Sequence, residues 1–498
     1  MMNINFIKLS RPKKGVIVCA YLEGGQLSPT AYTIDNETNG LISAAISCSQ
    51  FVGKAQQTLT VFTPSNRVLL IGIGKPSQIN LAFAEKFGGI IYETLANSAE
   101  EEATIMMELD DFKSVEIAAH LALGALLRSY RFDYYKTKIT KEEKPSLVNL
   151  FISVEKYSYA KKVYESEEAV AEGVFFTRDL VSEPANILFP SEFAKRVDLM
   201  TSLGLQIDIL EEKEIARLGM SAMLAVGQGS EHESKLVTMR WEGADKNQKS
   251  IAFIGKGVCF DTGGISLKPS TGMEEMKFDM GGAGVVCGLM RALAKRKAKA
   301  NVIGVIGLVE NMPDGRAQRP GDIVRSMSGQ TIEIINTDAE GRLILADLLW
   351  YTQDQYKPEF MIDIATLTGS IVVALGEETC GYFANNDAIA RELQAAANAV
   401  DEAIWRMPMG EVYNKQMDSD IADMKNAGSR WAGAITAACF LERFVNDLPW
   451  IHMDIAGVTW LRKNLPTAPK GASGFGVRAL NRLVFNHCEK KYEKNNLS

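Results

Sequence analysis

The segment that most constrains the fold of this chain is the octapeptide at residues 336–343, which reads NTDAEGRL. Residues 331–335 before it are apolar and β-branched and predict a strand, whereas residues 343–350 after it predict a largely buried helix. Ligands of open α/β sheets bind in the crevice outside the carboxyl ends of strands, where such a strand-to-helix loop lies. The octapeptide carries Asp338, Glu340 and Arg342. An ordinary turn explains it equally well when it is taken alone, because Asn, Asp and Gly are turn formers.

The 498 residues exceed the length of one ordinary domain, so we expect more than one. Residues 1–158 alternate strand-like and helix-like runs and predict an N-terminal α/β domain. Residues 159–186 predict a connecting helix that ends at Pro184. From residue 187 to 498 the alternation resumes, with strands predicted at 205–210, 236–241, 250–254, 301–309, 331–335, 360–365 and 450–455. We therefore predict an α/β fold of two domains, each a mainly parallel or mixed sheet flanked by helices.

Composition narrows the class of protein. The net charge of −7, with no sustained Lys/Arg cluster, does not suggest nucleic acid binding. The N-terminus lacks the features of a secretory signal, and no apolar run reaches the ~18 residues of a membrane span. The 7 cysteines are scattered and never form CxxC, which is typical of a reducing compartment. These features predict a cytoplasmic protein with no membrane partner.

A glycine pair at residues 72–74, reading GIG, is a possible nucleotide loop. It lacks the third glycine of a dinucleotide fingerprint and the spacing of a P-loop. We therefore interpret it as a structural turn.

Three loops of the second predicted domain concentrate charged residues beside glycines. The first follows the strand predicted to end at residue 254 and carries Lys256, Asp261 and Lys268. The second carries Asp279 and enters a helix predicted at residues 282–295. The third is the octapeptide. If the loops stay apart, each is a solvated turn, and the sequence alone leaves that alternative open.

If the loops converge, they imply a metal site, because clustered carboxylates repel one another unless cations are present. The ligands are rich in oxygen, and the 4 histidines of the chain form no metal-binding pair, which suits Mg²⁺, Mn²⁺ or Zn²⁺. Four carboxylates are many for one ion that must keep open positions, whereas two ions about 3.5–4 Å apart can share bridging carboxylates. The residues thus predict a candidate two-metal hydrolytic site.

The same loops resemble motifs of the leucyl aminopeptidase (cytosol aminopeptidase) family. The matching segments are the octapeptide, GKG at 255–257 with DTGG at 261–264, and MK at 276–277 with DMGGA at 279–283. Supporting matches include EPAN at 183–186, ENMP at 310–313, ATLTG at 365–369 and GFGVR at 474–478. The resemblance covers essentially all of the second domain, whereas the first matches only in its general pattern. Ser182 stands where family members usually carry asparagine.

The resemblance implies a metallo-exopeptidase, a hydrolase that releases N-terminal, preferably leucine-like, residues from peptides. It implies two divalent ions, manganese or zinc, bridged by Asp261 and Glu340. One ion would also bind Lys256 and Asp279, and the other would bind Asp338 through its side chain and carbonyl. As a ligand, Lys256 requires a neutral amine, which a neighbouring cation can enforce.

The resemblance also assigns roles beyond the metal ligands. Lys268 would stabilise the oxyanion, and Arg342 would hold a bicarbonate ion that acts as general base. Met276, Thr366 and Gly369 match the pocket for the first side chain, with ordinary core packing as their alternative explanation. A homo-hexamer is implied as well. The competing function is a non-catalytic DNA-binding or regulatory protein on the same scaffold, but four clustered carboxylates without metal would only destabilise such a protein.

Overall fold

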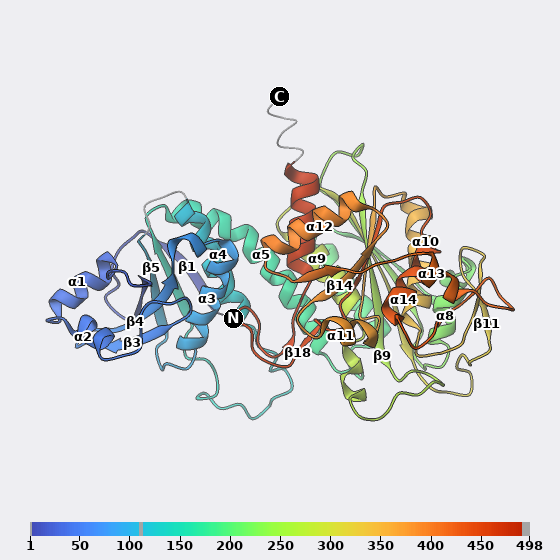
Figure 1. The fold of residues 1–498 in the computed structure, drawn as a ribbon, viewed down its shortest axis with the longest axis horizontal. Coiled ribbons are helices and arrows are strands. Elements are labelled where there is room, and N and C mark those ends of the chain that lie inside the picture. Colours follow the sequence, from blue (N-terminus) through green and yellow to red (C-terminus); the bar gives the residue numbers. More distant parts are fainter. Residues whose placement is uncertain (1, 109–112, 491–498) are drawn as a thin grey trace. The chain divides into compact units, whose positions relative to one another are not determined.

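The computed structural model describes residues 2–108 and 113–490. The chain forms two compact units (Figure 1). Unit 1 comprises Met1–Ala171 with Lys463–Lys470, and unit 2 comprises Glu172–Arg462 with Gly471–Ser498. Each unit is a sheet flanked by helices, which confirms the predicted α/β class. The short return of residues 463–470 to unit 1 leaves no local signal in the sequence.

Unit 1 is built on a six-stranded sheet with the order β1-β6-β5-β2-β4-β3. All neighbouring strands are parallel except β3, which is antiparallel to β4. Helices α1 and α2 pack on one face through a cluster that includes Ile34 and Ile42. The strands are β1 Asn3–Ile7, β2 Val16–Leu22, β3 Thr58–Phe62, β4 Arg67–Gly74, β5 Glu102–Met107 and β6 Asn149–Val154; the helices are α1 Pro29–Glu37, α2 Leu41–Ser47, α3 Leu81–Leu95 and α4 Lys113–Arg128. Helix α5 (Tyr157–Ser182) begins in unit 1 and continues into unit 2.

Unit 2 is built on an eight-stranded sheet with the order β15-β14-β17-β13-β9-β10-β8-β7. The central strands β17, β13, β9 and β10 are mutually parallel, and antiparallel strands flank them on both sides. Buried central strands of this kind are nearly continuous apolar runs. The strands are β7 Gln206–Leu210, β8 Lys235–Glu242, β9 Ile251–Asp261, β10 Asn301–Asn311, β13 Met361–Ala365, β14 Cys380–Ala384, β15 Ile404–Arg406 and β17 Trp450–Asp454.

Helices cover both faces of this sheet. On one face α9 (Gly281–Lys295) packs against β10, where Val286 and Met290 lie beside Gly304. On the other face α10 (Gly341–Tyr356) packs with its Ile344 against Gly307, three residues further along β10. The remaining helices are α6 Pro190–Asp198, α7 Glu212–Arg217, α8 Ser221–Gly227, α11 Gly369–Leu375, α12 Asp387–Ala399, α13 Glu411–Asn414, α14 Gly433–Glu442 and α15 Val477–Val484.

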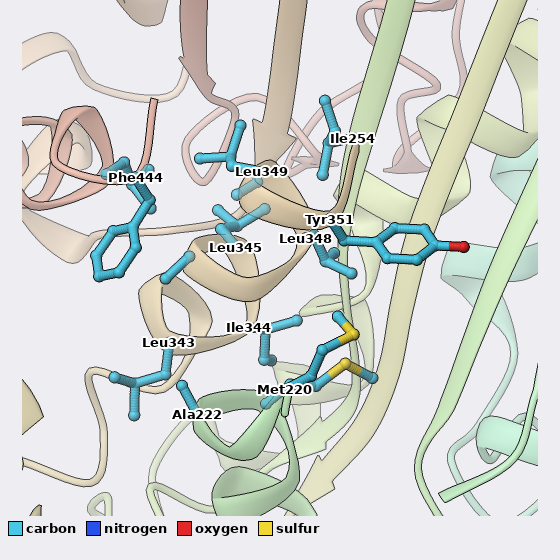
Figure 2. Close-up of a cluster of buried hydrophobic side chains, with 14 of the residues drawn as sticks. Met220, Ala222, Ile254, Leu343, Ile344, Leu345, Leu348, Leu349, Tyr351 and Phe444 are labelled. Atoms are coloured by element: carbon cyan, nitrogen blue, oxygen red, sulfur yellow. The ribbon is translucent and has the colours of Figure 1, made fainter. Parts of the chain in front are cut away.

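Helix α10 lies at the centre of the core. Figure 2 shows its leucine and isoleucine side chains projecting from several sides of the helix into a cluster that also contains Met220 and Phe444. Apolar side chains on several sides of a helix indicate that the core encloses it, as it encloses the first three turns of α10. Each fully buried side chain of this size contributes roughly 1.5–3 kcal/mol relative to an exposed one. The N-terminus of α10, which begins directly after Glu340, is therefore firmly placed.

Two sequence predictions about the site's strands are wrong in detail. Strand β9 does not end at residue 254 but runs to Asp261, because it pairs with β10 as far as Asn311. The strand before the octapeptide, β12 (Thr331–Glu333), is not part of the main sheet. It pairs with β11 (Ile323–Arg325) on one side and with β16 (Met424–Lys425) on the other, in a separate three-stranded sheet. These two neighbours supply hydrogen-bond partners for the backbone of its 3 residues.

Within the described residues, no helix is both long enough and apolar enough to cross a membrane.

Candidate metal centre

Strand β9 supplies two of the predicted site residues from within the strand. Lys256 and Asp261 are five positions apart, so a regular strand would direct them to opposite faces. A β-bulge intervenes, because Val258 pairs with Val309 and Asp261 with Asn311, which leaves β9 one residue longer than β10 over this stretch. One extra residue reverses the alternation of faces. The bulge therefore allows both side chains to reach the same site.

The second carboxylate, Asp279, follows the short helix of residues Met273–Phe278 and precedes α9. It is 5% exposed. The hydroxyl of Thr366 donates to Asp279 Oδ1 at 2.8 Å and to its backbone carbonyl at 3.1 Å. The end of β13, just before Thr366, thus fixes the orientation of this carboxylate.

The octapeptide completes the cluster. Carboxylate oxygens of Asp261, Asp338 and Glu340 lie within 4.8 Å of one another, which is close enough for shared metal coordination. Asp261 and Glu340 are buried and Asp338 is partly exposed. The structure thus brings the three charged loops of the second predicted domain to one place.

Two lysines lie between these carboxylates. Lys256 Nζ is 2.7 Å from Asp279 Oδ1 and 2.8 Å from Glu340 Oε1. Lys268 Nζ is 2.8 Å from Asp261 Oδ2 and also pairs with Asp338. The two environments differ, since the Lys256 side chain is 3% exposed and that of Lys268 is 22% exposed. Lys256 is enclosed in the site, and Lys268 reaches it from the open side.

Burial is the largest influence on the carboxyl groups. It raises the pKa of Asp279, Asp338 and Glu340 above the ordinary values, and Asp261 raises that of Glu340 further. The nearby lysines act in the opposite direction but do not cancel the effect. The ionised forms of these three carboxyl groups are therefore disfavoured in the buried site until a cation binds there.

For the two lysines, the neighbouring charges outweigh the effect of burial on the pKa. Burial opposes their protonation, but the carboxylates outweigh it, led by Asp279 at Lys256 and by Asp261 at Lys268, so the pKa of each lysine is raised. Without a cation in the site, both are ammonium groups. Lys256 also donates to the backbone carbonyl of Thr366 at 2.9 Å.

Close packing at Gly341 keeps Lys256 in place. A Cβ atom at residue 341 would lie 2.5 Å from Lys256 Cε. No side chain fits there while the lysine keeps its partners. The glycine of the octapeptide is thus required by a close approach and not by its turn conformation.

Arg342 lies in the first turn of α10 and is buried. Its Nη1 donates to the backbone carbonyl of Asn426 at 2.8 Å, and its Nε has no hydrogen-bond partner among the described residues. Burial lowers the pKa of Arg342 to about 10. A cavity of about 300 Å³ lies beside it, lined also by Asp338 and Gly369.

The three residues predicted to line the substrate pocket lie in different surroundings. Gly369 is exposed at the start of α11 and lines the cavity beside Arg342. Thr366 is buried behind Asp279, whereas Met276 is partly buried in the short helix before that residue.

Two asparagines that sequence reasoning missed hold the loops together. Asn311 Nδ2 donates to Asp261 Oδ1 at 2.8 Å and to the Thr337 carbonyl at 3.0 Å. Asn426 is fully buried, and its Oδ1 accepts from the backbone N–H groups of residues 335 and 336. Its Nδ2 donates to the carbonyls of residues 336 and 339. Only the segment around Asn311 carried a signal, because it belongs to the ENMP match.

The departure at Ser182 has a simple structural context. Lys277 Nζ donates to the backbone carbonyl of Ser182 at 3.0 Å. The contact uses no side-chain atom of residue 182, so it does not require asparagine there.

Comparisons with known proteins agree with this site. The model of the cytosol aminopeptidase family, catalytic domain, matches residues 175–481, and the model of that family's N-terminal domain matches residues 16–139. A probable cytosol aminopeptidase of Caulobacter vibrioides is 51% identical over 496 residues, which cover 98% of this chain and 100% of the relative. A probable cytosol aminopeptidase of Rhodopseudomonas palustris is 48% identical, with 99% of each chain covered.

Solved structures show the same similarity in three dimensions. A mutant of tomato leucine aminopeptidase superposes with a TM-score of 0.89 at 32% identity, covering 98% of this chain and 97% of that one. The bottromycin maturation enzyme BotP, in complex with Mn, gives a TM-score of 0.83 at 30% identity, covering 94% and 98% of the two chains. The chain therefore belongs to the cytosol aminopeptidase family and is a metal-dependent aminopeptidase.

Proposed function

We propose that this aminopeptidase works with two divalent ions, manganese or zinc, and releases leucine-like residues from the free N-terminus of peptides. The observation that carries the proposal is the convergence of Asp261, Asp338 and Glu340, whose carboxylate oxygens lie within 4.8 Å of one another. Asp279 stands beside them across Lys256. A cluster of buried carboxyl groups is an environment that divalent cations stabilise, because a bound cation favours the ionised carboxylates.

The donor set fits two ions better than one, since four carboxylates would fill the sphere of a single ion and leave no position for water or substrate. Asp261 and Glu340 would bridge the pair. Lys256 and Asp279 would complete one site, and Asp338 the other. When bound, the ions would supply Lewis acidity for activating a water molecule and a positive anchor for the substrate's α-amine.

Lys256 requires one further argument, because the surrounding carboxylates favour its ammonium form. An ammonium group has no lone pair to donate to a metal. A divalent ion next to it reverses the local electrostatics and favours the neutral amine. Metal binding at Lys256 should therefore release a proton, as it does whenever a protonated ligand must be deprotonated.

Lys268 is suited to a different task. Its side chain reaches the cluster from the more exposed side, where a substrate can approach. We assign its ammonium group to the substrate's scissile carbonyl, where it would donate a hydrogen bond to the developing oxyanion. This role requires that Lys268 stays protonated, and the raised pKa of Lys268 agrees with it.

Arg342 would bind bicarbonate. Its guanidinium is buried, its Nε lacks a partner within the described residues, and the adjoining cavity of about 300 Å³ has room for a small anion. An oxygen of bicarbonate would satisfy Nε, and the bound ion would serve as general base. The N-terminus of α10, directly beside Arg342, also favours an anion.

The preference for leucine-like residues is assigned to Met276, Thr366 and Gly369. Met276 offers an adaptable apolar surface. Gly369 leaves space, because a Cβ atom there would meet no heavy atom within 4 Å. The name of the tomato leucine aminopeptidase agrees with this preference.

The proposal includes a homo-hexamer. Several large apolar side chains of unit 2 are strongly exposed in the single chain, among them Val373 at 90% and Trp431 at 73%. Contacts between subunits would cover such groups. Sedimentation that gives a stable monomer of 54.7 kDa at micromolar concentration would contradict this part of the proposal.

The decisive test uses leucine amide and its N-acetylated form. We expect hydrolysis of the free amine, loss of activity after exhaustive chelation, and recovery with Mn²⁺ or Zn²⁺. We expect the N-acetylated substrate to be a poor one, because acetylation removes the amine that the ions would anchor. Equal rates for the two substrates would exclude the amine anchor, and activity that survives confirmed metal loss would exclude the metal mechanism.

A further inference from the structure

Unit 1 contains a cavity of about 410 Å³ that plays no part in the metal centre. It lies between the sheet and the helices α3 and α4, and its walls are mainly apolar. Val18, Ile71 and Ile105 line it from three neighbouring strands, and Phe87 and Leu121 line it from the two helices. Its volume is within the range of about 300–1,000 Å³ that is typical of small-molecule sites.

The cavity lies at the carboxyl ends of parallel strands. Strands β2 and β5 are neighbours and parallel. After β2 the chain continues toward β3 and β4 on one side, whereas after β5 it returns through α4 to β6 on the other. Such a reversal is a topological switch point, where open α/β sheets bind their ligands.

The helices above the cavity are locked to each other. A Cβ atom at Gly88 of α3 would lie 1.8 Å from the carbonyl oxygen of Leu121, and one at Gly124 of α4 would lie 1.8 Å from that of Glu85. The two backbones are thus in contact. A buried pair between Glu85 Oε1 and His120 Nδ1, 2.7 Å apart, joins the same helices. Neither helix can tilt alone into the hollow, so the cavity is a built feature of the fold.

Among the described residues, one charged group lines the cavity. Glu108 follows β5 directly, and its carboxylate accepts hydrogen bonds from Thr30, from the backbone N–H at 2.9 Å and from the hydroxyl at 2.5 Å. These bonds fix its position but do not neutralise it. Among the side chains that the structure describes, no lysine, arginine or histidine forms an ion pair with Glu108. An anchored anion beside apolar walls is complementary to a cation that carries a hydrocarbon group.

We propose that this cavity binds a small apolar amine, with its hydrocarbon group among the apolar walls and its ammonium group on Glu108. The chemistry of the cavity favours an amine over the alternatives. An anionic ligand would be repelled by Glu108, and a neutral hydrocarbon would bring that carboxylate no cation and no hydrogen-bond donor beyond those of Thr30. The site is separate from the metal centre and does not depend on the proposed peptidase mechanism.

The test is equilibrium dialysis of the metal-loaded full chain with phenethylamine and, in parallel, with 2-phenylethanol, which lacks the charge. The metal centre is itself proposed to bind amines, so the wild type is compared with variants that fill only the cavity. Ala84→Phe places a ring in the cavity from α3, and Ile73→Trp does so from β4, because both native residues line it. Two filling variants are used so that a folding defect in one leaves the other informative.

We expect each filling variant to bind one equivalent of phenethylamine less than the wild type while its peptidase activity is unchanged. Glu108→Gln keeps the shape and an acceptor for Thr30 but removes the charge. Glu108→Gln should lower the affinity of the cavity for phenethylamine about tenfold and leave binding of 2-phenylethanol unchanged. Equal stoichiometry in the wild type and both filling variants would overturn the site. Equal affinity of Glu108→Gln and wild type for phenethylamine would overturn the ligand class.

Discussion

Replacing Lys256 and Lys268 separately by alanine distinguishes two roles within one charge cluster. Lys256 is enclosed, with Asp279, Glu340 and the carbonyl of Thr366 as partners. Its removal leaves two buried carboxylates without a cation. Breaking a buried pair in this way costs about 3–5 kcal/mol. We therefore expect metal-free Lys256→Ala to be destabilised by an amount of this order.

Lys268→Ala should behave differently. The Lys268 side chain is 22% exposed, so water can replace part of what it provides. We expect a smaller loss of stability in the metal-free protein, about 1 kcal/mol, because partly exposed ion pairs contribute little. With metal bound, the main effect should be on kcat, by about 10²–10³-fold, as for the loss of one oxyanion-hole donor.

The measurements are metal content by elemental analysis, urea denaturation with and without metal, and steady-state kinetics. Lys256→Ala should hold less metal at one site, and excess metal should restore part of both its stability and its activity. Lys268→Ala should hold both ions and show a nearly unchanged KM. If Lys268→Ala loses an ion while Lys256→Ala keeps both, the two assignments are reversed. Lys268→Arg is not a safe control, because a planar guanidinium cannot replace a compact ammonium.

Three further substitutions test the support of the site. Gly341→Ala should displace Lys256, since the new Cβ would lie 2.5 Å from its Cε. The variant should hold less metal, and its free energy of unfolding in urea should fall by about 1–3 kcal/mol. Asn311→Leu should lower metal affinity about 10–100-fold in titration by freeing Asp261, and stability in urea denaturation should fall by about 1–3 kcal/mol because the Thr337 carbonyl loses its donor. Asp347→Ala should cost about 1–3 kcal/mol in urea denaturation and spare kcat, because the buried carboxylate contacts no metal ligand within the described part of the chain and accepts the backbone N–H groups of Met223 in α8 and Met327 in the turn after β11.

The local signals of the sequence predicted much of the architecture. Apolar periodicity placed α9 at residues 282–295, one residue from its observed start, and it identified the buried core of α10 and the connecting part of α5. These elements are long, and their packing agrees with their intrinsic preference. Charge beside glycine identified the loops that the structure brings together.

What the sequence could not show depends on distant partners. Lys256 seemed to lie in a loop because glycines flank it, but β9 continues since β10 pairs with it. The bulge that places Lys256 and Asp261 in one site is a property of two strands and not of either alone. The sheet that holds β12 is likewise completed by a strand at residues 424–425, more than ninety residues later. No pattern within β12 specifies that partner.

The asparagines at the metal centre illustrate a constraint that residue type alone does not reveal. Asn311 and Asn426 each tie backbone segments by donating and, at Asn426, also by accepting hydrogen bonds. An ionised carboxylate at either position could accept hydrogen bonds but not donate them. It would also add negative charge to a cluster in which four carboxyl groups already share two lysines. A lysine could only donate, and it would compete with the metal ions for the carboxylates. A neutral amide does both without altering the charge. Asn426 lies 84 residues beyond Arg342, in a segment with no acidic or metal-binding pattern of its own. That segment nevertheless supplies the neutral amide that holds the backbone of the octapeptide without changing the charge of the site.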